Sequence, residues 1–139
     1  MTTNEALCTP AELAAARDWV ARFQARWRTL DPDALRELMH PDTQNLIPPM
    51  AAPADCEGVV AHFKQAQALL PDLRIEVVRW AASGDAVFIE WTASATVNGH
   101  PIAWTGVDRV RLRDHRTYEG RVFWDTRKLA EQIALARQA

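Results

Sequence analysis

The sequence predicts an α+β domain in which amphipathic helices come first and a curved antiparallel sheet follows. Apolar residues recur at helical spacing through the N-terminal half, and after Pro71 the apolar pattern changes to period two. The Asn98–Gly99 pair, between two alternating runs, indicates a tight hairpin turn. We therefore expect a cone-shaped barrel: a four-strand antiparallel meander plus one short strand, covered on one face by three N-terminal helices, with a C-terminal helix.

The first helix is predicted over residues 9–30. Thr9 suits the N-cap because Glu12 follows three residues later, and Pro10 suits the first helical position. Apolar residues then recur on one side of this segment. The remaining elements expected before the sheet are a short helix at 31–40, a short strand at 43–50 and a third helix at 55–70.

Four successive strands of a meander are predicted from the period-two pattern. A Ser83–Asp85 turn and the Asn98–Gly99 turn separate the first three strands. Asp125 is the expected N-cap of the last helix. The predicted strands are 73–82, 86–97, 100–114 and 116–125, and the predicted final helix is 127–138.

The 139-residue length corresponds to one domain, which we place at residues 9–139 after a disordered N-terminus at 1–8. The net charge is −2 and the charges are interspersed, so no basic face for nucleic acid is expected. No apolar run reaches membrane-spanning length. The two cysteines are typical of free thiols in a reducing compartment. These features predict a cytoplasmic protein without a nucleic-acid or membrane partner.

Neither a metal nor an organic cofactor is expected. The four histidines are dispersed along the chain, and no two occur at the spacing of a metal-binding motif. The sequence also has no glycine-rich loop of the kind that holds a nucleotide.

Asp108 is the most unusual feature of the predicted sheet. Read at period two, residues 102–112 place apolar side chains on one face, and Asp108 lies among them. Burying an unpaired charge is costly, so such a carboxyl becomes a neutral acid, finds a partner, or faces a cavity. Two interpretations follow: Asp108 is an acid/base group, or a backbone N–H or an arginine of the next strand holds it.

The same parity predicts a cavity with one further polar candidate, Asn45, to orient a carbonyl or a water. Mostly apolar walls with a few polar groups are typical of a small-molecule site. For Trp91 and Trp104, core packing is a simpler role than contact with a ligand, and turn formation explains Asn45 as well as contact with a ligand does. The predicted substrate-binding residues are Phe23, Trp27, Ile47, His62, Ile89, Trp91, Trp104, Val122 and Trp124.

The order of predicted elements resembles the SnoaL-like branch of the nuclear transport factor 2-like superfamily. This scaffold hosts polyketide cyclases, ketosteroid isomerases, epoxide hydrolases and non-catalytic binding proteins, so the resemblance implies a fold more than a chemistry. The segments that carry it are LDPDALRELMHPDT, LLPDLRIEVVRW, GDAVFIEWTASAT and VDRVRLRDHRTYEGRVFWDTRKLAEQI.

Ketosteroid isomerases combine a tyrosine, an aspartate base and a protonated aspartate that donates to an oxyanion. In our alignment these positions fall at Phe23, Ile47 and Asp108. Only the oxyanion donor is kept. The resemblance therefore implies that Asp108 can act as a neutral acid. It does not imply the ketosteroid isomerase mechanism, because the aspartate base is absent.

Limonene-type epoxide hydrolases offer a second comparison. TQNLIPP resembles their water-binding segment, which places Asn45 at a water ligand. Their arginine and two aspartates fall at Trp91, Ala93 and Val122, so that triad is absent. SnoaL-type cyclases, with one acid/base aspartate in an apolar cavity, conflict least with this sequence.

The leading expectation is a cofactor-free acid/base enzyme, a cyclase or isomerase, for a small hydrophobic carbonyl compound. The alternatives are a non-catalytic domain that binds a small hydrophobic ligand, and an epoxide hydrolase-like enzyme with a non-standard site. We also expect a homodimer. Its interface would be the outer sheet face, which carries Phe88, Thr92, Ser94, Thr96, Thr105 and Val107 between charges.

Overall fold

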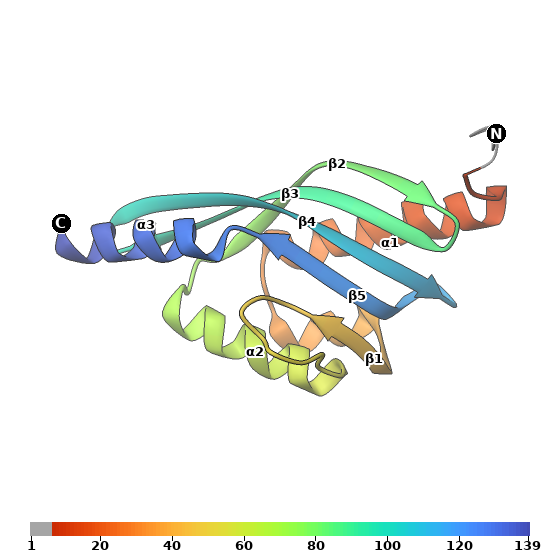
Figure 1. The fold of residues 1–139 in the computed structure, drawn as a ribbon, viewed down its shortest axis with the longest axis horizontal. Helices are drawn as coiled ribbons and strands as arrows, with labels where there is room; N and C mark the ends of the chain where they lie inside the picture. Colours follow the sequence, from red (N-terminus) through yellow and green to blue (C-terminus); the bar gives the residue numbers. More distant parts are fainter. Residues whose placement is uncertain (1–6) are drawn as a thin grey trace.

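The computed structural model describes residues 7–139, in which helices lie against one curled sheet (Figure 1). Residues 1–6 of the expected disordered N-terminus lie outside the described residues. The mixed α+β class is confirmed, and the five-stranded sheet is curled without closing into a barrel. The elements are α1 (Pro10–Arg28), η2 (Pro32–Leu38), β1 (Met39–Leu46), α2 (Cys56–Leu69), β2 (Arg74–Ser83), β3 (Ala86–Val97), β4 (His100–Arg113), β5 (Arg116–Trp124) and α3 (Thr126–Gln138).

The helices α1, α2 and α3 each begin directly after a capping residue, and the sequence predicted two of these caps, Thr9 and Asp125. Thr9 and Glu12 form a reciprocal capping box at α1, with N–O distances of 2.8 and 3.1 Å. Asp55 caps α2 and Asp125 caps α3, and each carboxylate accepts a backbone N–H three residues on. Among residues 7–139, no helix is both long and apolar enough to cross a membrane.

The second predicted helix and the first strand have different boundaries in the structure. The helix is a 3₁₀ helix that ends at Leu38, and β1 begins at Met39 instead of Thr43. Met39 pairs in parallel with Thr117 of β5, a partner far along the sequence that local periodicity cannot reveal. Pro41 is tolerated because β1 is an edge strand with an irregular register.

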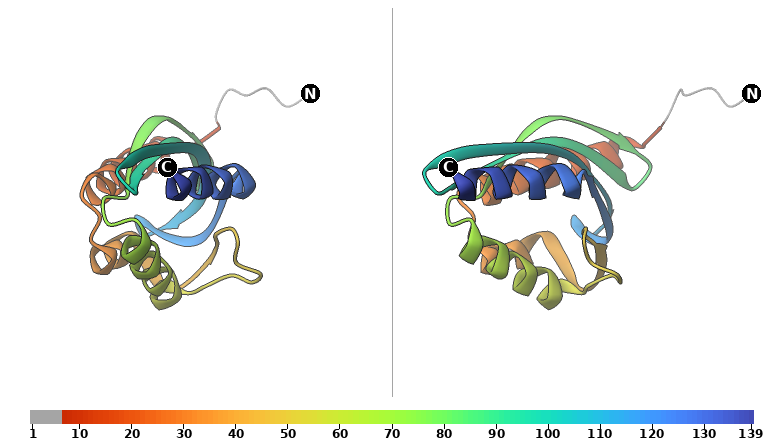
Figure 2. Two further views of the ribbon diagram at one scale, coloured as in Figure 1. Left: turned by 90° about the vertical axis from the view of Figure 1, so that its left-hand side faces the viewer. Right: turned by 60° about the vertical axis from the view of Figure 1, so that its left-hand side comes forward.

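The sheet order is β1-β5-β4-β3-β2, and β2 to β5 form the predicted antiparallel meander. The turn between β3 and β4 has positive φ angles at Asn98 (51°) and Gly99 (75°), which this short connection requires. The sheet curls around α1, as the views in Figure 2 show. One sheet face is therefore concave. Ile102, Asp108 and the other residues of β4 with the same parity lie on this concave face.

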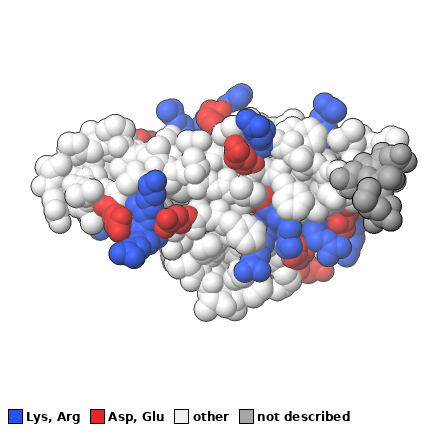
Figure 3. All heavy atoms as spheres, turned by 45° about the horizontal axis from the view of Figure 1, so that its top comes forward, with Lys and Arg blue, Asp and Glu red and all other residues white. Residues whose placement is uncertain are grey.

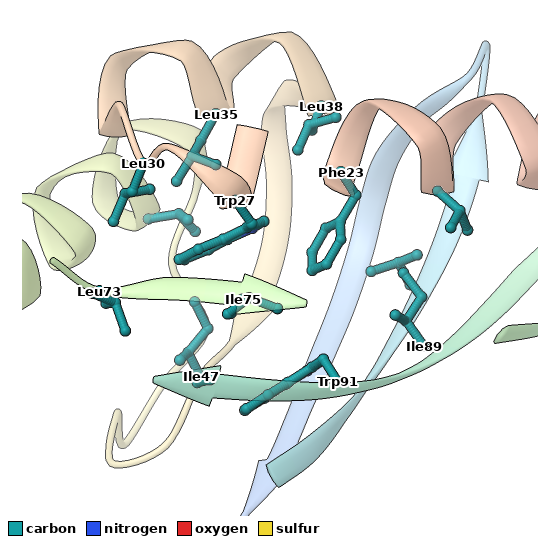
Figure 4. Packing of buried hydrophobic residues seen from close by; sticks show 14 of the residues in the cluster. Phe23, Trp27, Leu30, Leu35, Leu38, Ile47, Leu73, Ile75, Ile89 and Trp91 are labelled. Carbon is teal, nitrogen blue, oxygen red and sulfur yellow. The ribbon is translucent and has the colours of Figure 1, made fainter. Parts of the chain in front are cut away.

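The core lies between the concave face and the helices. Phe23 and Trp27 of α1 face Ile75 of β2 and Trp91 of β3 (Figure 4). All four side chains are buried. This packing holds α1 at a distance from the sheet that is set by large aromatic side chains.

Gln24 of α1 forms hydrogen bonds with backbone groups on the outer edge of β2, which is the other edge strand. Its Nε2 donates to the carbonyl of Ile75 at 3.0 Å, and its Oε1 accepts the N–H of Val77 at 2.6 Å. The β2–β3 register shifts directly after Val77. One side chain thus satisfies both kinds of backbone group where the edge strand is irregular.

We expect Gln24→Ala to lower the free energy of unfolding by about 1–3 kcal/mol, because a partly buried N–H and C=O lose their partners. Urea denaturation followed by circular dichroism measures this. Gln65→Ala on the exposed side of α2 is the matched control and should change stability by less than about 0.5 kcal/mol. Equal effects of the two substitutions would contradict the assigned role of Gln24.

Candidate active site

A cavity of about 170 Å³ lies between the concave sheet face and the helices. Residues from all of the elements named above, α1 to α3 together with η2 and β1 to β5, line it, so the whole fold contributes to the site. Of the residues that the sequence predicted, the structure places Phe23, Trp27, Asn45, Ile47, His62, Trp91, Trp104, Asp108, Val122 and Trp124 in its lining.

Ile89 does not line the cavity. Its side chain is fully buried on the part of β3 that lies below α1 (Figure 4). Ile89 has the predicted parity, since it pairs with Asp108 across the strands. Parity gives the face of a strand but not how far along the strand a helix covers it.

The lining also contains aromatic residues that we did not predict. Trp19 stacks on Phe23 with ring centroids 5.2 Å apart, and Phe63 of α2 contacts the edge of Trp27 at 4.8 Å. The four-residue spacing of Trp19, Phe23 and Trp27 was a usable signal for the first of these. Leu129 of α3 also lines the cavity, and no local pattern placed that helix beside it.

Asp108 lies on the cavity wall, on the concave face of β4. Its Oδ1 accepts a hydrogen bond of 2.7 Å from Nε1 of Trp91. The partner is therefore an indole, and neither a backbone N–H nor an arginine as the sequence had suggested. Burial raises the pKa of Asp108 to about 7, and the Trp91 hydrogen bond opposes this only in part.

His62 of α2 is the other titratable side chain of interest in the lining. Its ring contacts Phe63 edge-on at 4.9 Å, and it is half-buried. Burial lowers the pKa of His62 below its usual value, so the imidazole is neutral at pH 7. The charged side chains of the lining are therefore Arg121 of β5 and the ionised fraction of Asp108.

Asn45 reaches the cavity from β1, but most of its hydrogen-bonding groups are used by the protein. Its backbone exchanges two hydrogen bonds with Ala54, and its Nδ2 donates to Oγ1 of Thr43 at 2.9 Å. Sδ of Met39 lies 3.8 Å from the same Nδ2. Asn45 can therefore offer a ligand its amide oxygen as an acceptor, whereas its N–H donors are engaged.

A family model for the SnoaL-like domain matches residues 20–120. IdmH from Streptomyces antibioticus, a candidate polyketide cyclase, is 26% identical over 86% of this chain and 98% of its own, with a TM-score of 0.77. Candidate polyketide cyclases from Bacillus cereus and Jannaschia share the fold. The Bacillus cereus protein is 20% identical over 92% of this chain and 89% of its own, with a TM-score of 0.79. The Jannaschia protein is 21% identical over 91% of this chain and 95% of its own, with a TM-score of 0.78. No curated protein sequence matches the chain.

The raised pKa of Asp108 makes a testable contribution to stability. Between about pH 4 and pH 7 the folded chain binds this proton and the unfolded chain releases it, so the contribution falls as the pH rises. We expect the wild type to lose stability relative to Asp108→Asn over this range, by at most about 1.4 kcal/mol per pH unit, with no further change above pH 7.

Urea denaturation of both proteins at several pH values measures the difference. Subtracting the free energy of unfolding of the variant cancels the contribution of the other carboxylates. Asp72, for example, has a lowered pKa, so its contribution to stability grows with pH. A difference that stays constant from pH 4 to pH 7 would show that Asp108 titrates normally.

Proposed function

The chain belongs to the SnoaL-like domain family, and on that premise we propose that it is a cofactor-free acid/base enzyme for small hydrophobic carbonyl compounds. The observation that carries this proposal is the carboxyl of Asp108, with a pKa of about 7, on the wall of an apolar cavity. A pKa near the working pH is optimal for a group that must both accept and donate a proton. Cyclase or isomerase chemistry requires both.

In the proposed step, the carboxylate of Asp108 removes a proton from the carbon next to a carbonyl. The C–H electron pair moves into the enolate, and the Asp108 O–H later returns the proton to the product. The indole N–H of Trp91 binds Oδ1, which leaves Oδ2 for the substrate. Because that N–H stabilises the carboxylate, it also favours the state that accepts the proton.

The cavity supports a small and uncharged substrate. A cavity of about 150 Å³ binds benzene in another protein, so about 170 Å³ suits a compound of one or two rings. Trp27, Trp91 and Trp104 offer flat apolar walls, and the amide oxygen of Asn45 can accept a hydrogen bond from a hydroxyl. Because most of the lining is apolar, a charged substrate would lose more hydration on entering it than an uncharged substrate would.

The two alternatives have less support. Epoxide hydrolysis by an arginine and two aspartates would need charges at Trp91, Ala93 and Val122, and these cavity residues are uncharged. Ligand binding without chemistry would use the same cavity. The Asp108→Asn variant separates binding from catalysis, because it removes the titratable proton and keeps the size of the side chain.

We expect the protein to accelerate hydrogen–deuterium exchange next to the carbonyl of some members of a panel of one- and two-ring ketones in D₂O. Asp108→Asn should slow this exchange by about a hundredfold to ten-thousandfold. The wild-type rate should rise up to about pH 7 and then level off, because the carboxylate is the active form. Nuclear magnetic resonance of the ketone measures the rate.

Asp114→Asn is the matched control, since Asp114 is an exposed turn carboxyl, and it should keep the wild-type rate. Ketones that bind equally to the wild type and to Asp108→Asn, with no exchange by either protein, would favour the binding domain over the enzyme.

We also propose that the outer sheet face pairs with a second copy of the chain. Phe88, Val107 and Phe123 expose 41%, 37% and 48% of their surface there, on three neighbouring strands. On the side of the molecule that carries β2 and β3, small groups of adjacent positive and negative side chains are separated by uncharged surface (Figure 3). Such a mixed face can be complementary to itself about a twofold axis.

Light scattering at micromolar concentration should give twice the mass of the chain. Phe88→Glu should return the mass to that of a monomer, because it buries a charge at the interface. Leu135→Glu, at an exposed position of α3, should leave the dimer intact. A monomeric wild type would exclude this interface.

A further inference from the structure

We propose that Gly106 is a positioning residue of the site: its missing side chain lets the indole of Trp91 lie across β4 and reach Asp108. The inference concerns the carboxyl on which the proposed function rests. It can be tested without any substrate, so the two proposals can fail separately.

The geometry follows from the strand register. Trp91 of β3 pairs directly with Gly106 of β4, and Asp108 lies two residues along β4 on the same concave face. A Cβ atom on Gly106 would lie 2.5 Å from Cη2 of Trp91, and Cζ2 is closer still. Real Cβ atoms do not approach other atoms this closely, so any side chain at position 106 requires the ring to move.

The φ angle of Gly106 is not positive, so it gives no reason for glycine at this position. The glycines with positive φ among residues 7–139 are Gly84 and Gly99, and both occupy turns. Glycine inside a strand weakens it and often marks a close approach of another group. At Gly106 that group is the ring of Trp91, together with the carbonyl oxygen of Phe123, 2.7 Å from the same Cβ position.

Moving the ring has a defined electrostatic consequence. The hydrogen bond from Trp91 stabilises the carboxylate of Asp108, so its loss raises the pKa of Asp108 further. The other titratable side chains near the cavity are His62 of α2, which is neutral, and Arg121 of β5, which lies over the Phe123 ring at 5.1 Å. Opening the cavity to water would have the opposite sign and would lower the pKa.

The experiment titrates the aspartate carboxyl carbons by ¹³C nuclear magnetic resonance, with Asp108→Asn to assign the signal. We expect Gly106→Ala to raise the pKa of Asp108 by about one to two units, as the loss of one hydrogen bond to a charged group does. Trp91→Phe removes the donor and should give a shift of the same sign and size. In the double variant the shifts should not add, because the bond is already absent.

Phenylalanine also lacks the part of the ring that a Cβ on residue 106 would touch. Gly106→Ala should therefore lower the melting temperature less when it is combined with Trp91→Phe than when it is made alone. If Gly106→Ala alone does not fold and the double variant does, the same steric contact is demonstrated.

Two results would overturn the proposal. One is an Asp108 pKa that stays unchanged or falls in Gly106→Ala. The other is failure of Gly106→Ala to fold both alone and with Trp91→Phe, because the Phe123 carbonyl would then be what requires glycine.

Discussion

The hydrogen bond from Trp91 to Asp108 is the interaction on which the character of this cavity depends. A carboxyl on an apolar wall is poorly solvated, and this single indole N–H is a neutral donor. This hydrogen bond holds the carboxyl in position, but it stabilises the carboxylate less than burial destabilises it. The pKa of Asp108 is therefore about 7. An arginine in the same place would have held the group as a permanent carboxylate.

The fold brings the two groups together through its curl. Because the sheet wraps around α1, the concave side chains of β3 and β4 converge, and Trp91 can lean across Gly106 to the next strand. The aromatic side chains of α1 then hold the helix away from the sheet, which leaves space that smaller residues would have closed. The cavity is therefore a result of bulky residues packed on a curved surface.

Local patterns in the sequence predicted the helices, the meander and the face that carries Asp108, because caps, periodicity and the Asn98–Gly99 turn are local signals. They missed what depends on partners distant in sequence. The parallel pairing of Met39 with Thr117 moved the start of β1. The covering of Ile89 by α1 removed it from the predicted site. The Trp91–Asp108 bond also needs strand register and sheet curl, which parity alone does not contain.

Asp108 has different surroundings from two other carboxylates of this chain, Asp72 and Asp85. Asp72 accepts two hydrogen bonds from Thr96, at 2.9 Å and 2.6 Å, and these lower the pKa of Asp72. Asp85 is partly buried, yet hydrogen bonds from Tyr118 and Arg111 lower its pKa as well. At Asp108 the effect of burial outweighs the neutral donor Trp91, so the pKa of Asp108 is shifted in the other direction. A carboxyl that served only to hold strands together would be expected to have the first kind of environment, whereas proton exchange near neutral pH requires the second.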